Sequence, residues 1–325
     1  MTRRRLSVTA AVLLLVLMPV TGCVTVHGEQ ALVPAVTKAE AAKALDRFTR
    51  LNNDAKRSYD PATLAKAETG ALGALDHAGL TARHANHPEG NPQAVPLKLT
   101  DARFLIPEQR GWPKWFAADT VSNASGDAHW LLLFQRSAVS EPWKASYLAL
   151  IAAGRMPTFV LDHDGYAEPV PLDGSGLLVE PGRLSTAYTS YLQTGTAATL
   201  AFADGPQTSQ VRQQRRKGAS TSAAVTEYAD QPVGAGEFPP VGLRTTDGGA
   251  LVFFASRHQS RLTTPGKPLK VDDPDTKALM TGTPKNSVTL IRVAEQAVTV
   301  PPANDAQGKV VFLSRLLGLV SAKGE

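Results

Sequence analysis

The sequence has a single cysteine among its 325 residues, at position 23. A lone cysteine cannot close a disulfide within the chain and cannot supply the ligands of a cysteine-based zinc site. A disulfide-stabilised miniature domain and a zinc ribbon are therefore excluded. Glycine and proline number 26 and 23, too few for a low-complexity chain, and the length suffices for two domains of ordinary size.

An excess of positive charge is also missing once the N-terminus is set aside. The chain has 34 basic and 29 acidic residues, and Arg3, Arg4 and Arg5 lie in a first segment of 22 residues that contains no acid. The remainder therefore carries a net charge of only +2, from 31 basic and 29 acidic residues. Nucleic-acid-binding proteins usually show a larger and more clustered excess, so we expect no nucleic-acid partner.

Known catalytic and metal-binding signatures are absent as well. The chain lacks H-E-x-x-H, G-x-S-x-G, S-x-x-K and a phosphate-binding loop. His84 and His87 lie in a polar loop predicted for residues 84–92, which does not aim both at one metal. Asp162–Gly165 resembles the start of a calcium loop without its later ligands, and a hairpin turn is the preferred interpretation. We predict no catalytic residues, no metal and no cofactor.

The N-terminus carries the most specific pattern. Arg3–Arg5 precede an apolar run at Ala10–Val20, which is too short for a transmembrane helix of roughly 20 residues. The sequence Val20-Thr21-Gly22-Cys23 then resembles the lipobox of bacterial lipoproteins, in which signal peptidase II cleaves before a diacylglyceryl-modified cysteine. This predicts a signal peptide over residues 1–22 and an acylated (palmitate-type) Cys23. Two acyl chains anchor a protein stably, here at the outer face of the cytoplasmic membrane.

Two alternatives to this interpretation stay open at the sequence level. An ordinary signal peptide followed by a chance cysteine would also explain the apolar run. The segment Thr2–Leu6 faintly resembles a twin-arginine export signal, although the general secretory route is favoured.

The rest of the chain predicts helices followed by strands, twice. After a tether over residues 23–36, Thr37 and Glu40 form a capping box that opens one helix, and Asp60-Pro61 opens a second that Gly79 ends. Period-two patterns predict strands at 97–106, 115–121, 129–139, 143–151 and 158–168. Beyond a Pro- and Gly-rich linker at 173–182, we expect helices at 184–192 and 206–217 and strands at 224–231, 250–264 and 287–301, with 310–320 ambiguous.

These patterns predict an α+β fold of two similar-sized domains, at 37–172 and 183–325. Each domain would pack N-terminal helices on one face of a curved antiparallel sheet. The segments Trp130–Ser137 and Ala250–Arg257 are loosely alike and similarly placed, which suggests an old duplication.

Short motifs add a family resemblance. The Asp60-Pro61 helix start, Gly111-Trp112-Pro113-Lys114-Trp115-Phe116-Ala117 and Trp143-Lys144-Ala145-Ser146-Tyr147 resemble a family of actinobacterial secreted lipoproteins that carry a domain of unknown function. The order of elements also resembles NTF2-like and cystatin-like folds. The resemblance covers most of the mature chain and implies no catalytic residues.

All four tryptophans fall within one window of 32 residues, at positions 112, 115, 130 and 143. Large aromatic side chains usually belong to the core. Core packing is therefore the favoured interpretation of all four. Trp112 and Trp115 flank Pro113 in a segment typical of a loop, however, and are the candidates for the rim of a ligand-binding mouth, with Trp112 pointing outward.

A basic cluster, Arg212, Arg215, Arg216 and Lys217, ends the predicted helix at 206–217. Cations at a helix C-terminus are favoured by the helix dipole, which is a sufficient structural reason for them. Docking on anionic lipid is the alternative.

Together these observations predict a membrane-anchored extracytoplasmic lipoprotein that acts as a non-catalytic binding module at the cell surface. Its partners would be membrane lipid, through the acylated cysteine, and a cell-envelope protein or a small apolar ligand. The alternative is an extracytoplasmic, hydrolase-like enzyme with its site in the cavity of the first domain.

Overall fold

The computed structural model describes residues 31–195, 201–221, 223–234 and 236–325. Leu32–Glu325 forms one compact unit, to which the following account refers. The predicted signal peptide and Val20, Thr21, Gly22 and Cys23 lie outside the described residues. Within the described part of the chain, no helix has the length and apolarity needed to cross a membrane.

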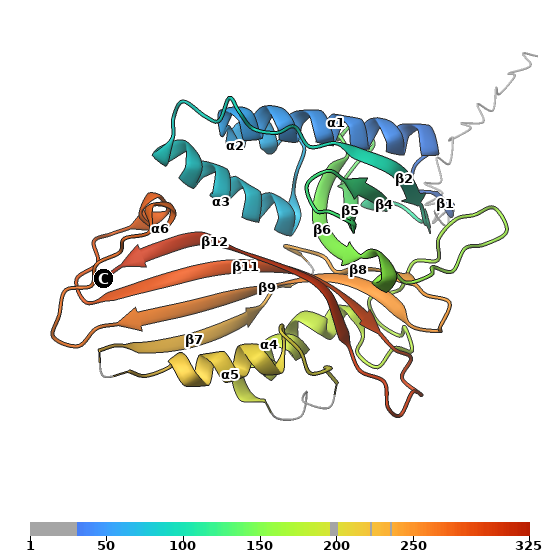
Figure 1. The fold of residues 1–325 in the computed structure, drawn as a ribbon. Coiled ribbons are helices and arrows are strands. Elements are labelled where there is room, and N and C mark those ends of the chain that lie inside the picture. The colour runs from blue at the N-terminus through green and yellow to red at the C-terminus, as the bar shows by residue number, and fades with distance from the viewer. Residues whose placement is uncertain (1–30, 196–200, 222, 235) are drawn as a thin grey trace, which may run out of the picture. The chain divides into compact units, whose positions relative to one another are not determined.

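Apart from the short β1 and α6, the order of elements is helices first and strands later, twice over (Figure 1). The helices are α1 (Lys38–Ser58), α2 (Pro61–Leu64), α3 (Gly70–Asn86), α4 (Leu184–Thr194), α5 (Ser209–Gly218) and α6 (Pro274–Ala278). The strands are β1 (Val33–Pro34), β2 (Leu99–Leu105), β3 (Glu108–Gln109), β4 (Lys114–Ser122), β5 (Ala128–Arg136), β6 (Lys144–Ala152), β7 (Val225–Pro232), β8 (Val241–Arg244), β9 (Ala250–Thr263), β10 (Met280–Thr281), β11 (Ser287–Val300) and β12 (Val311–Gly324).

The predicted start of α1 is confirmed. The Thr37 hydroxyl accepts a hydrogen bond from the Glu40 amide at 3.1 Å, which satisfies one of the free donors of the first helical turn. One stripe of apolar residues on α1 is buried and consists of Ala41, Ala44, Leu45, Phe48 and Leu51.

The second helix differs from the prediction. Asp60 caps α2 as expected, but α2 ends at Leu64, and α3 runs through Gly79 to Asn86. A tertiary contact causes the break, because the Thr69 amide donates to the Ala145 carbonyl of β6 at 2.8 Å. Gly79 is tolerated inside the helix, since glycine costs only about 1 kcal/mol there relative to alanine. His84 consequently lies on α3 rather than in a loop.

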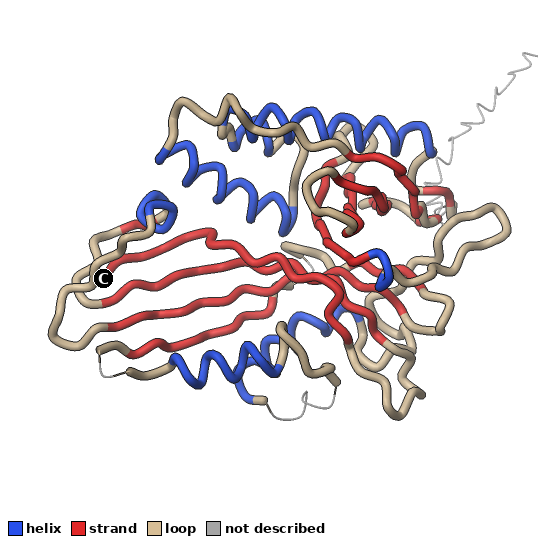
Figure 2. Tube along the Cα trace, viewed as in Figure 1, coloured by secondary structure: helices blue, strands red, loops and turns tan. Residues whose placement is uncertain are grey.

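Two main sheets form the centre of the unit (Figure 2). The smaller sheet is antiparallel, with strand order β2-β4-β5-β6. The larger sheet has the order β10-β12-β11-β9-β7, with β8 paired to the first residues of β9. The segment 310–320, ambiguous in sequence, belongs to the strand β12 from Val311 onward. The predicted strand 158–168 makes only isolated bridges, because the Asp162 carboxylate accepts from the Asp164 and Tyr166 amides and forms a turn there.

Four layers follow from the burial of side chains. Helix α1 packs on the outer face of the smaller sheet through Phe48, Phe116 and Phe134. Helix α4 packs on the opposite outer face, that of the larger sheet, through Tyr188 and Phe254. Figure 1 shows α1 above the smaller sheet and α4 and α5 below the larger one.

The inner faces of the two sheets share one core. Leu133 and Tyr147 from the smaller sheet pack in the same cluster as Leu251, Phe253 and Val293 from the larger sheet. A mixed α and β fold is thus confirmed, whereas a two-domain NTF2-like or cystatin-like architecture is not. The boundaries 37–172 and 183–325 and the duplication stay predictions.

The segments predicted as tether and linker also take part in packing. Val33–Pro34 pairs with β3, and Val36 is buried. In the linker, Leu177 is buried against the larger sheet, and the Leu178 amide donates to the Pro301 carbonyl at 2.9 Å. Both segments therefore contribute to the compact unit over these residues.

Candidate functional site

A polar region interrupts the outer face of the larger sheet, beside the apolar contact with α4. Along β9 the residues on this face change from Val252 and Phe254 to Ser256, His258 and Ser260, because alternate residues of a strand share a face. The register of the sheet places Asp230 of β7 on one side of His258 and Arg292 of β11 on the other.

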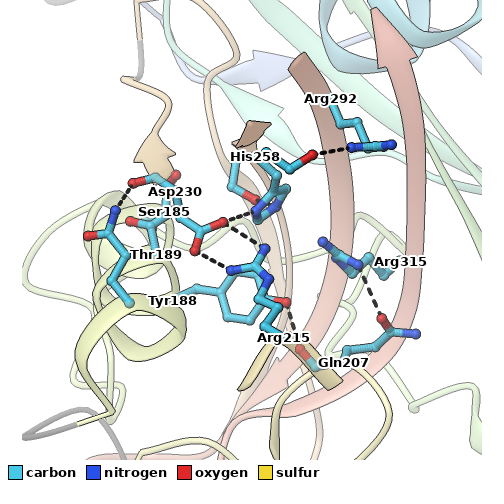
Figure 3. A network of polar contacts seen from close by, with 12 residues as sticks. Ser185, Tyr188, Thr189, Gln207, Arg215, Asp230, His258, Arg292 and Arg315 are labelled. Atoms are coloured by element: carbon cyan, nitrogen blue, oxygen red, sulfur yellow. Dashed lines mark hydrogen bonds and ion pairs between the residues drawn. The ribbon is translucent and has the colours of Figure 1, made fainter. Parts of the chain in front are cut away.

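A chain of hydrogen bonds runs through this region (Figure 3). His258 Nδ1 lies 2.5 Å from Asp230 Oδ1, and His258 Nε2 lies 2.9 Å from the Ser256 hydroxyl. Arg215 of α5 donates to both oxygens of Asp230, at 2.5 and 2.9 Å. Gln296 of β11 donates to the Ser256 hydroxyl at 2.7 Å. Since an ionised carboxylate only accepts, His258 carries its proton on Nδ1 and accepts from Ser256.

Burial and charge decide the protonation states in this chain. Burial opposes ionisation of Asp230, but hydrogen bonds from His258 and Arg215 outweigh it and lower the pKa of the carboxyl. Burial lowers the pKa of His258, and the positive charges of Arg315 and Arg215 act in the same direction against the nearby Asp230. The site therefore holds a neutral imidazole, an ionised carboxylate and a charged guanidinium at neutral pH.

Two further arginines face the same region from the strands. Arg292 donates to the Ser260 hydroxyl at 3.1 Å, and Arg315 of β12 lies 3.5 Å from Gln207 Oε1. Burial lowers the pKa of both guanidinium groups. Arg315 Nε is buried without a hydrogen-bond partner, and neither arginine forms an ion pair with a described carboxylate.

A cavity of about 280 Å³ collects these groups, and we call it the arginine pocket. It is lined by Val211, Gln214, Arg215, Tyr228, His258, Gln259, Ser260, Arg292, Arg315 and Leu317. Arg215 also lies over the Tyr228 ring, 4.8 Å from its centroid. Three guanidinium groups and one buried carboxylate give the pocket an excess of positive charge.

The order Ser256–His258–Asp230 matches that of a serine hydrolase triad, but access to the serine differs. Ser256 is completely buried and does not line the arginine pocket. Its hydroxyl oxygen already accepts from Gln296. A nucleophile must reach the substrate carbon, and this hydroxyl is closed off. The arrangement favours binding of an anion over acyl transfer.

The predicted tryptophan rim lies elsewhere, at one end of the smaller sheet. Trp112 is 43% exposed, as expected, while Trp115 is partly buried against the shared core. Trp143 is buried and donates from its indole to Glu40 at 3.0 Å. Trp130 lines a separate cavity of about 380 Å³ between α1 and the smaller sheet, which neither Trp112 nor Trp115 lines. A ligand-binding role for Trp112 and Trp115 stays a prediction.

A further acid and base lie together on the smaller sheet, beside Trp130 in the chain. His129 Nδ1 lies 2.6 Å from Asp119 Oδ1, across β4 and β5. The described residues contain no group of three or more His, Cys, Asp or Glu that can hold a metal ion.

Sequence reasoning missed the arginine pocket, apart from Arg215. Asp230, His258, Arg292 and Arg315 are distant in the chain and meet only through strand pairing. One signal was present, namely the alternation of polar residues in the second half of a strand whose first half is wholly buried.

Comparison with known proteins supports an assignment to a family. Two relatives, each named an uncharacterized lipoprotein, come from Streptomyces coelicolor (47% identical) and Streptomyces avermitilis (46% identical), and each match covers 94% of this chain and 91% of the relative. A second uncharacterized lipoprotein of Streptomyces coelicolor is 27% identical over 89% of this chain and 82% of its own length. No solved structure matches. The model of the domain of unknown function DUF8094 matches residues 32–324, and the chain belongs to that family.

Proposed function

We propose that this protein is an extracytoplasmic, lipid-anchored, non-catalytic binding module whose ligand is an anion held in the arginine pocket. The observation that carries the proposal is Arg315: among the described residues, its buried Nε has no hydrogen-bond partner and its guanidinium forms no ion pair. A buried charge is costly unless it is paired, so an anionic ligand would supply the missing partner.

The chemistry of the pocket favours an oxyanion. A guanidinium presents several N–H donors in a fixed plane, which suits the paired oxygens of a phosphate, sulfate or carboxylate. Arg292 and Arg315 approach from β11 and β12, while Asp230 already occupies two donors of Arg215. Arg292 and Arg315 would therefore contact the anion directly, and Arg215, bound to Asp230, would line one side of the pocket.

The rim of the pocket is suited to an uncharged part of the same ligand. Tyr228 and Leu317 are 38% and 44% exposed, and both line the cavity. An apolar rim around a few polar groups is the usual composition of a ligand site. The proposal replaces a small apolar ligand with an amphipathic anion and moves the site from the first half of the chain to the second.

The membrane anchor is the second part of the proposal. The names of the relatives support a lipoprotein. We propose acylation at Cys23 after cleavage of residues 1–22, which would hold the arginine pocket outside the cytoplasmic membrane.

Binding of small anions tests the proposal directly. We expect phenyl phosphate to bind the purified protein more tightly than inorganic phosphate, in isothermal titration calorimetry, because its ring meets the apolar rim. Arg315→Gln should weaken binding by about tenfold or more, the range for a charge-assisted hydrogen bond. Arg257→Gln is the matched control, since Arg257 is a half-exposed arginine on the same strand as His258 that pairs with Glu237. Equal affinity in the wild type and Arg315→Gln would reject the pocket.

A further inference from the structure

Exposed apolar side chains gather where the chain enters the compact unit. Leu32 and Val33 are 50% and 42% exposed, Trp112 is 43% exposed and Val139 is 73% exposed. These are four of the ten large hydrophobic residues that are exposed in the described part of the chain. We call Leu32, Val33, Trp112 and Val139 the entry surface.

Two cationic side chains connect these residues in space. Lys114 Nζ donates to the Val33 carbonyl at 3.4 Å and lies 5.9 Å from the centre of the Trp112 ring. The guanidinium of Arg136 lies 5.2 Å from the centre of the same ring and donates to the Val139 carbonyl at 2.7 Å. Val33, Trp112 and Val139 therefore belong to one surface.

The entry surface is held firmly from behind. Arg136 donates to Glu40 at 2.6 Å and lies 5.4 Å from the ring centre of the buried Trp143. Trp143 donates to the same carboxylate. Trp112 thus rests on a cation that α1 and β5 fix in place, so its exposed ring presents a preorganised apolar face.

The length of chain before this surface limits where it can lie. Cys23 precedes Leu32 by only nine residues, which span at most about 30 Å when fully extended. If Cys23 is acylated, the entry surface stays within that distance of the lipid. The other basic candidate for membrane contact, the end of α5, lies on the far side of the larger sheet from α1, and its Arg215 is engaged by Asp230 (Figure 1).

We infer that the entry surface rests on the lipid bilayer, with the Trp112 ring in the interfacial region. Tryptophan is enriched at this depth because it has an apolar ring and one polar N–H. Of the two cations behind Trp112, Arg136 is paired with Glu40, and Lys114 is buried and donates to the Val33 and Gln109 carbonyls. Contact therefore depends on apolar and aromatic partition and not on anionic lipid. The inference rests on acylation of Cys23 and is independent of the arginine pocket.

Quenching of tryptophan fluorescence by brominated lipid tests this contact. The full-length acylated protein is reconstituted in vesicles of brominated phosphatidylcholine, and its emission is compared with that in unbrominated vesicles. We expect the bromine to quench the wild type, and Trp112→Phe to lose most of that quenching. Trp130→Phe is the control, because Trp130 lies toward the opposite end of β5 from Arg136, and it should keep the quenching.

A second variant and two further arms complete the experiment. Val139→Asp keeps all tryptophans, and we expect it to reduce the quenching at least twofold by opposing burial in the interface. Mass spectrometry of the N-terminal peptide establishes acylation in the same sample, and an unmodified Cys23 overturns the inference. Quenching unchanged in both Trp112→Phe and Val139→Asp also overturns it. Quenching that requires phosphatidylglycerol and disappears in high salt would assign the contact to a basic surface instead.

Discussion

Arg215 on helix α5 and Asp230 on strand β7 form a bidentate ion pair, with N–O distances of 2.5 and 2.9 Å. The side chain of Asp230 is completely buried, and that of Arg215 is 16% exposed. α5 has no fully buried residue, and the ion pair joins it to the larger sheet beside the partly buried Val211. The pair also neutralises the carboxylate that orients His258.

Removing Arg215 should therefore destabilise the fold. Loss of one member of a buried ion pair leaves an uncompensated charge and costs about 3–5 kcal/mol. We expect Arg215→Ala to lower the free energy of unfolding by about 3 kcal/mol, since His258 still donates to Asp230. Chemical denaturation measures this change. Arg216 is the next residue on α5 and is exposed, so Arg216→Ala should change stability by less than about 0.5 kcal/mol. An equal effect of both variants would contradict this assignment.

Replacing Arg315 should stabilise the fold, the opposite effect to replacing Arg215. Without ligand, the unpaired guanidinium is a cost to the folded state, so Arg315→Met should raise stability by about 1–3 kcal/mol. Phenyl phosphate should raise the melting temperature of the wild type, because a ligand that binds only the native state stabilises it. Phenyl phosphate should leave the melting temperature of Arg315→Met unchanged. Differential scanning fluorimetry with and without the ligand measures both effects, and a destabilised Arg315→Met would show that the guanidinium already has adequate partners.

The carboxyl of Glu68, before α3, should make stability decrease with pH. Both of its oxygens are buried, and neither has a hydrogen-bond partner in the described part of the chain. Burial raises the pKa of Glu68 well above its usual 4.5, the negative charges of Asp76 and Glu295 raise it further, and Lys56 partly opposes them. Because the pKa of Glu68 is higher in the folded state, protonation of this carboxyl favours folding. That contribution to stability is fully present below pH 4.5 and is lost as the pH rises through the folded pKa.

Glu68→Gln should remove that contribution. We expect the variant to gain about 1–3 kcal/mol over the wild type at pH 8 and to gain little at pH 4.5. Urea denaturation across this range measures the difference. Some pH dependence should remain, because burial also raises the pKa of Glu295. Glu89→Gln, at an exposed glutamate, is the control. A gain in stability of Glu68→Gln that is the same at both pH values would exclude a raised pKa for Glu68.

Acylation of Cys23 can be tested in cells. Cys23→Ala should prevent lipid attachment, so the protein should accumulate as a precursor or appear in the medium. Fractionation and electrophoresis follow its size and location, and Gly28→Ala, five residues further on, is a control that keeps the cysteine. A Cys23→Ala protein that is processed normally and stays on the membrane would refute the lipobox interpretation.

Local patterns predicted the elements of this fold better than their assembly. The capping box at Thr37 and the largely apolar runs of β9 and β11 depend on neighbouring residues, so they can be identified from the chain itself. The break before α3 could not, because it depends on the hydrogen bond between Thr69 and Ala145, 76 residues apart. The segment at 158–168 has a strand pattern and lacks a partner along its length.

The candidate site shows the same limit more sharply. Arg215 was visible as part of a basic cluster, and its position near a helix end sufficed to explain it. The carboxylate that it binds comes from another element, and Arg292 and Arg315 join the pocket only through the register of β9, β11 and β12. Spacing in the sequence carries no information about such register.

Strand β9 separates two cores with alternate side chains. Leu251 and Phe253 face the core between the sheets, while Val252 and Phe254 face α4. Because β9 contributes side chains to both cores, unfolding one core would expose the apolar side chains of the other. The unit from Leu32 to Glu325 should therefore melt in a single calorimetric transition. A truncation at the proline- and glycine-rich segment would then release a fragment with an open apolar sheet face, and cutting the gene there would yield aggregates instead of two soluble halves.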